Sequence, residues 1–164
     1  MSNNGTIIKV SGPLVVAKGL SGTCIYDMVR VGNYKLFGEV VEIRGEEYFI
    51  QVYEETEGLG PGEPVYPTHS AFSVELGPGL IGAIYDGIQR PLDVINRLHG
   101  DYIVRGIEHP PLDRTKKWHF HPVKHVGDEI VPGDVIGYVQ ESKLVKHQIM
   151  VPVDVKGRLS SIEE

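Results

Sequence analysis

The sequence of 164 residues predicts a mainly β protein with a six-stranded N-terminal β-barrel, a connector that holds one short helix, and a second small β module. Three observations lead to this prediction. Short apolar stretches alternate with turn residues through the first half of the chain, one helical pattern follows a proline in the middle, and two Gly-Asp turns separate short apolar stretches further on. Since domains commonly run to roughly 100–150 residues, two small domains are expected.

Six strands are expected over residues 6–10, 14–17, 28–31, 36–43, 47–52 and 71–76. Alternation is clearest over 36–43, and Arg44-Gly45-Glu46 supplies a hairpin turn after it. Many short strands with regular turns are typical of a small barrel or sandwich. The period of two predicts an inward-facing set made of Leu14, Val16, Val40, Ile50 and Val52.

One helix is expected over residues 91–98. Pro91 suits the first turn, where a missing N–H costs nothing, and Leu92, Ile95 and Leu98 give the helix an apolar side. Gly100 is the usual kind of residue just past a helix end.

The second β module has a recognisable pattern of turns. Gly127-Asp128 and Gly133-Asp134 each precede a short apolar stretch, and a hairpin with Lys143 follows. This pattern resembles the biotinyl/lipoyl barrel-sandwich, in which a lysine ten residues after the second Gly-Asp turn carries the cofactor. Two interpretations stay open: a carrier domain modified at Lys143, or an ordinary solvated lysine on a hairpin.

Three histidines form a His-x-His-x-x-x-His pattern at His119, His121 and His125. Residues two apart on a strand face the same side, so His119 and His121 with His125 form a candidate three-ligand zinc site. The alternative is that the first two flank an aromatic strand as half-buried polar residues.

The sequence shows no catalytic or cofactor-binding residue. It contains no G-x-x-x-x-G-K-[ST] loop, which cradles nucleotide phosphates, and the glycine-rich stretches 58–62 and 77–79 are expected to be plain turns. The paired carboxylates Glu54-Glu55 and Glu163-Glu164 are assigned to solvated surface, and Cys24 is expected to act as a small apolar filler.

Charge and composition exclude several classes of function. A formal net charge of −6 with scattered basic residues gives no electrostatic footprint for nucleic acid. No apolar run approaches the ~18 residues needed to cross a bilayer, so no direct membrane contact is expected. A single cysteine and the lack of a leader pattern point to the reducing cytosol.

Several stretches are similar to the catalytic alpha chain of archaeal and vacuolar-type rotary ATPases and ATP synthases, also called their A-type catalytic chain. They occur along nearly the whole chain, at residues 7–16, 29–32, 38–43, 51–64, 73–80, 84–92, 116–120 and 147–152. The resemblance implies an N-terminal barrel over 1–76, a connector over 77–109 that begins the nucleotide domain, and an outward bulge over 110–164.

The resemblance also implies a role in an ion-translocating complex. The barrel is expected to pack beside non-catalytic B subunits, and residues 110–164 are expected to face peripheral stalk subunits. ATP and Mg²⁺ would belong to a full-length subunit, while this chain is expected to be an N-terminal portion that is inert toward ATP and lies in the cytoplasm as part of a membrane-attached complex. The segment 80–98 is expected to lack the sheet that covers it in the intact family.

Overall fold

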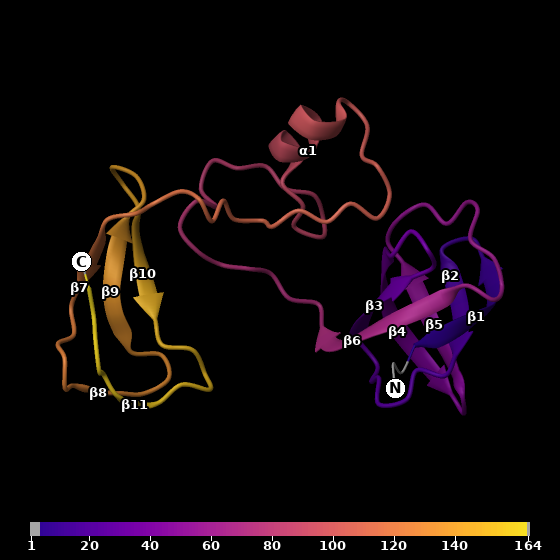
Figure 1. Ribbon diagram of the computed structural model, residues 1–164, viewed down its shortest axis with the longest axis horizontal. Helices are drawn as coiled ribbons and strands as arrows, with labels where there is room; N and C mark the ends of the chain where they lie inside the picture. The colour runs from indigo at the N-terminus through magenta and orange to yellow at the C-terminus, as the bar shows by residue number, and fades with distance from the viewer. Residues whose placement is uncertain (1–3, 164) are drawn as a thin grey trace. The chain divides into compact units, whose positions relative to one another are not determined.

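The structure, a computed structural model, describes residues 4–163 (Figure 1). Contacts between Cα atoms divide the chain into two compact units. The first runs up to Val74 and includes Val94–Glu108, while the second is made of Glu75–Asp93 and the residues from His109 onward. The boundary between the units therefore falls inside the helix α1, Leu92–His99.

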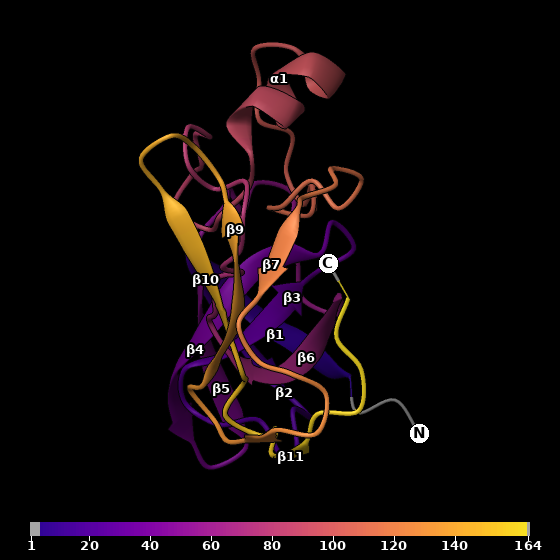
Figure 2. The same cartoon turned by 90° about the vertical axis from the view of Figure 1, so that its left-hand side faces the viewer.

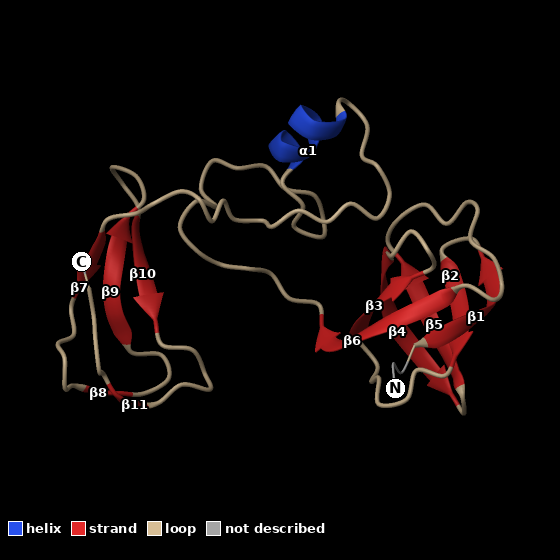
Figure 3. Cartoon of the chain, viewed as in Figure 1, coloured by secondary structure: helices blue, strands red, loops and turns tan. Residues whose placement is uncertain are grey.

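The first unit is a closed antiparallel barrel with the strand order β1-β2-β5-β4-β3-β6 (Figure 3). Its strands are β1 Gly5–Ser11, β2 Leu14–Lys18, β3 Asp27–Val31, β4 Leu36–Arg44, β5 Glu47–Val52 and β6 Pro64–Ala71. The ladder closes where β6 pairs with both β1 and β3. The prediction of a six-stranded barrel is confirmed, and five of the six predicted strands lie within two residues of their expected bounds.

The sixth strand was predicted wrongly at 71–76, since β6 lies at Pro64–Ala71. Its prolines, Pro64 and Pro67, argue against a strand because they lack the N–H that a ladder needs. The structure accommodates this by using carbonyls instead. Gly32 N–H donates to the Pro64 oxygen at 2.8 Å, and Ile7 N–H donates to the Glu63 oxygen at 2.9 Å. At these positions the strand therefore only accepts hydrogen bonds, and it still takes part in the barrel.

The barrel core is a single cluster of buried side chains. Its members are Ile7, Val15, Ala17, Leu20, Val29, Val31, Leu36, Val40, Ile50, Val52 and Val65. The predicted inward positions Val40, Ile50 and Val52 are confirmed. Leu14 and Val16 lie outside this cluster, because Val15 and Ala17 of β2 occupy the core; Val16 is nevertheless buried. The strand carries apolar residues on both faces, so alternation alone cannot fix which face turns inward.

Helix α1 begins at Leu92, one residue later than predicted, and ends at His99. Pro91 stands just before the helix and forms an isolated β-bridge with Tyr85. Gly100 ends the helix as expected: its φ of 77° is left-handed, and its N–H donates to the Asn96 oxygen at 2.8 Å. Within residues 4–163, no helix is long and apolar enough to cross a membrane.

The second unit contains two small antiparallel sheets. The strands β7 Phe120–Pro122, β9 Val135–Gln140 and β10 Lys146–Met150 form one in the order β10-β9-β7, and β8 Glu129–Ile130 pairs with β11 Gly157–Arg158 in the other. Val139 and Val151 are buried. The Phe120 ring fills the space beside Gly137, where a Cβ would lie 2.2 Å from a ring carbon. This glycine is needed for that close approach.

Candidate functional site

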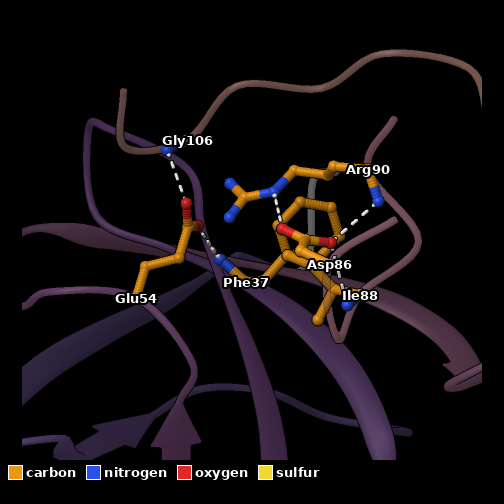
Figure 4. A network of polar contacts seen from close by, with 6 residues as sticks. All are labelled: Phe37, Glu54, Asp86, Ile88, Arg90 and Gly106. Atoms are coloured by element: carbon orange, nitrogen blue, oxygen red, sulfur yellow. Dashed lines mark hydrogen bonds and ion pairs between the residues drawn. The ribbon is translucent and has the colours of Figure 1, made fainter. Parts of the chain in front are cut away.

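The carboxylate of Glu54 ties the segment 105–108 to the barrel (Figure 4). Its Oε2 accepts from the Phe37 N–H at 2.9 Å, and its Oε1 accepts from the Gly106 N–H at 3.0 Å. Gly106 has a φ of 69°, and a Cβ there would lie 1.9 Å from the Tyr34 carbonyl oxygen. The assignment of Glu54 to solvated surface was therefore wrong, because both of its oxygens bind backbone N–H groups.

Two arginines strengthen the same attachment. The Arg105 guanidinium donates to the Glu57 carbonyl at 2.5 Å and lies 4.9 Å from the Tyr34 ring centroid. Arg30 pairs with Glu108 at 2.6 Å and stacks over a barrel aromatic ring. The segment after helix α1 thus returns to the barrel and is held by charge-assisted hydrogen bonds.

The Gly77-Pro78-Gly79 turn binds a carboxylate of the chain itself. Glu141, whose side chain is 4% exposed, accepts from the Gly79 N–H at 2.7 Å and from the Ile81 N–H at 3.2 Å through the same Oε1. Its Oε2 lies 3.4 Å from His147 Nδ1 without a hydrogen bond. The N–H groups that an anion-binding loop would offer to phosphate are already bound here, which agrees with a turn.

The second glycine-rich stretch, residues 58–62, is arranged in a similar way. Glu63 Oε1 accepts from the Gly60 N–H at 2.8 Å, and its Oε2 accepts from the backbone and side chain of Asn33. Carboxylates therefore bind the backbone of both glycine turns that resemble phosphate loops.

A buried ion pair organises the connector before the helix. Asp86 Oδ2 accepts from Arg90 Nε at 2.7 Å, and its Oδ1 accepts from the N–H groups of Ile88 and Arg90 at 3.1 and 2.8 Å (Figure 4). Arg90 is 7% exposed. Burial opposes ionisation of Asp86, yet the hydrogen bonds and charge of Arg90, with the Ile88 N–H, lower the pKa of the carboxyl.

The structure brings together two of the three histidines. The rings of His119 and His121 meet edge to face with centroids 4.4 Å apart, while the side chain of His125 is 90% exposed beside Asp128. Among residues 4–163, no group of three or more His, Cys, Asp or Glu side chains is placed to hold a metal ion. The candidate zinc site is not assembled in the described part of the chain.

Lys143 lies exposed in the β9–β10 hairpin. The turn is closed by Glu141 N–H, which donates to the Val145 oxygen at 3.0 Å, and by Ser142 Oγ, which accepts from the Val145 N–H at 3.1 Å. Leu144 beside it is 95% exposed. The lysine is accessible, and the expectation that it carries no cofactor stays a prediction.

Cys24 was also placed wrongly, since it is exposed and not a buried filler. Its N–H donates to Asp27 Oδ2 at 2.8 Å, so it belongs to a surface turn. Of the other paired carboxylates, Glu55 and Glu163 are exposed, as predicted, while Glu164 lies outside the described residues.

Sequence reasoning missed the structural roles of Asp86, Arg90 and Glu141. Asp86 and Arg90 are four residues apart outside a helix, so no periodicity marks them as a pair. Glu141 binds a turn 60 residues earlier, and its only sequence signal is an acidic residue at the end of an apolar strand.

Comparison with known protein families gives two matches. Residues 7–69 match the beta-barrel domain of the ATP synthase alpha/beta family, and residues 109–164 match the ATP synthase alpha/beta subunit barrel-sandwich domain. The first match covers the closed barrel, and the second covers the two small sheets.

Curated relatives match along almost the entire chain. It is 57% identical over 160 residues to the V-type ATP synthase alpha chain of Clostridium botulinum (strain Hall), and 54% identical to the corresponding A-type ATP synthase protein of Thermococcus kodakarensis. The V-type ATP synthase alpha chain 1 of Clostridium tetani is also 54% identical. In each case 98% of this chain is matched, and it spans 27% of the relative's length.

Proposed function

Because this chain belongs to the ATP synthase alpha/beta family, we propose that it serves as the N-terminal assembly portion of the catalytic subunit of an ion-translocating V/A-type rotary ATPase or ATP synthase. The observation that carries the proposal is identity of 54–57% over 98% of the chain. The closed barrel and the barrel-sandwich domain agree with it. The barrel contributes to a ring with non-catalytic subunits, and residues 110–164 contribute a bulge toward the peripheral stalk.

The chain by itself is inert toward ATP in this proposal. Phosphoryl transfer depends almost wholly on positioned phosphate-binding and Mg²⁺-binding groups. The sequence has no Gly-rich loop ending in Lys-Ser or Lys-Thr, and carboxylates bind N–H groups of both its glycine turns. ATP and Mg²⁺ are cofactors of the longer family subunit.

Calorimetry with Mg-ATP tests this inertness. We expect no heat beyond dilution and no phosphate release above buffer. Saturable binding at micromolar ATP would contradict it.

Exposed apolar side chains in the connector support the proposal that another domain covers this surface. Leu76, Ile81 and Ile84 are 76%, 61% and 68% exposed in the second unit. A contiguous apolar patch is typical of a surface that a partner covers. We assign that cover to the nucleotide domain of the longer subunit, which lies in the cytoplasm as part of a membrane-attached complex.

A competition experiment tests the assembly role. One of the full-length relatives is mixed with the non-catalytic subunit of its own complex, so that the two assemble into a ring. This chain is added in excess during the assembly. We expect the yield of complete rings to fall, because the chain occupies barrel positions without supplying the rest of the catalytic partner. A Val40→Asp chain, whose barrel core would hold an unpaired carboxylate, is the control and should not compete. Unchanged ring yield with the folded chain would overturn the proposal.

Intact mass separates this proposal from the carrier alternative. The expected mass is that of the unmodified polypeptide, since the hairpin with Lys143 serves contact and not a swinging cofactor. Added mass of a biotin or lipoyl group at Lys143 would favour the carrier.

A further inference from the structure

One face of the three-stranded sheet in the second unit carries a row of aromatic and basic side chains. In the strand register His121 lies opposite Tyr138, and Tyr138 lies opposite Gln148, so the three side chains share a face. The rings of His121 and Tyr138 stack with centroids 4.9 Å apart and planes 22° from parallel. The strands β7, β9 and β10 run side by side (Figure 2).

The row continues at both ends. The His119 ring meets His121 edge to face, with centroids 4.4 Å apart. At the other end Lys146 Nζ lies 3.5 Å from the Tyr138 ring centroid, a cation–π contact. These four residues, His119, His121, Tyr138 and Lys146, are called the basic aromatic row.

The opposite face of the sheet makes the core contacts. Phe120 packs against Gly137, and Val139 is 5% exposed. His119, Lys146 and Gln148 are exposed. His121 and Tyr138 are half-buried. The row therefore lies on the outer face, where the His119 ring and the Lys146 ammonium group are open to a partner and the two stacked rings are partly open.

The charge of these strands differs from that of the chain. Strands β7, β9 and β10 contain no aspartate or glutamate, although the whole sequence has 22 acidic and 16 basic residues. A sheet with a lysine, two imidazoles and a tyrosine on its outer face, and no carboxylate in its strands, is complementary to an acidic surface. Aromatic rings on such a face also supply apolar contact area.

We propose that the basic aromatic row is the docking face for an acidic segment of a partner protein. Carboxylates of the segment pair with Lys146 and accept from the imidazole N–H groups of His119 and His121, while apolar carbons of the segment lie on Tyr138. This proposal rests on the proposed function, in which the second unit is an assembly module. It adds which face binds and the chemistry of the partner.

Two other occupants fit the row poorly. Nucleic acid requires several Lys or Arg side chains on its phosphates, and the row offers one lysine in a chain of net charge −6. A second copy that docks through the same face in a two-fold contact would bring like charges together.

Titration with a synthetic peptide tests the proposal. A peptide of alternating Glu and Ala is added to the isotope-labelled chain, and amide shifts are followed by NMR. We expect saturable shifts concentrated in β7, β9 and β10, and binding about tenfold or more weaker in Lys146→Glu. Lys156→Glu is the matched control, because it makes the same charge change at an exposed lysine outside the row. It should bind nearly as well as the unaltered chain.

Several outcomes would overturn the proposal. Shifts that avoid the three strands, equal weakening by Lys156→Glu, or self-association that Lys146→Glu abolishes would each do so. The proposed function is judged separately, because Lys146→Glu should still compete for ring assembly through the barrel. If the chain binds the peptide but does not reduce the yield of rings in the competition experiment, only the proposed role of the barrel in the ring is overturned.

Discussion

At the scale of single residues, the pair Asp86 and Arg90 carries the largest expected energetic effect. Replacing Asp86 by Asn removes the carboxylate that faces a guanidinium that is 9% exposed. Loss of one partner of a buried pair costs about 3 kcal/mol or more. We expect the second unit of Asp86→Asn to unfold at lower denaturant, while the exposed Asp154→Asn control stays close to the unaltered chain. Identical denaturation curves would contradict the buried pair.

The same carboxyl predicts a dependence on pH. The pKa of Asp86 is lowered in the folded state, since the hydrogen bonds and charge of Arg90 outweigh the effect of burial. The ionised Asp86 carboxylate therefore contributes its full share of the free energy of unfolding above the pKa of the unfolded chain, about 3.9. That share is lost as the pH falls through the lower pKa of the folded state. NMR titration of the Ile88 and Arg90 amides should give a midpoint below about 3.9. A midpoint above that value would show that burial dominates.

Tyr53 offers a second titration on the barrel. Its hydroxyl donates to Glu39 Oε2 at 2.5 Å, and this hydrogen bond, with burial and the Glu39 charge, raises the pKa of the phenol to about 12. Ultraviolet titration of phenolate should show one tyrosine ionising later than the rest, and Glu39→Gln should remove that late step. Persistence of the late step in Glu39→Gln would mean that another group causes it.

At the scale of elements, Glu141 joins the β9–β10 hairpin to the turn at Gly79. Glu141→Ala leaves the Gly79 and Ile81 N–H groups without their acceptor, at a cost of about 2 kcal/mol. We expect faster amide exchange at both positions with the barrel unchanged. Glu129→Ala, at an exposed carboxylate of β8, is the control. Equal exchange rates in the two variants would show that the turn does not depend on Glu141.

Elements were predictable from the sequence where local pattern and tertiary packing agree. The strand β5 has the bounds that were predicted for it, because turn residues flank an apolar run. The strand β6 does not, since Pro64 and Pro67 argue locally against a strand and only the barrel closure explains them. The contacts of Glu54 and Glu141 could not be predicted from the sequence either, because they join residues more than 50 positions apart. Sequence pattern does not show such pairs.

At the scale of the whole molecule, the segment 80–98 should exchange readily. Ile81, Ile84 and Leu98 are 61%, 68% and 60% exposed. Apolar side chains without cover favour local opening or association. Hydrogen exchange should therefore be faster across the segment than in the barrel strands of a monomeric sample, and should approach the barrel values only where light scattering shows association. Strong protection in a proven monomer would contradict the assignment of a missing cover.

The proposed role of this chain is that of an assembly portion of a rotary ATPase catalytic subunit. The most direct measurement is sedimentation velocity of the chain mixed with an equimolar amount of the non-catalytic subunit of one of its relatives. We predict a new, faster boundary that contains both proteins, and its loss with Val40→Asp. Two boundaries that match the separate proteins, at concentrations where the full-length catalytic subunit does form a complex, would show that this chain lacks the proposed assembly role.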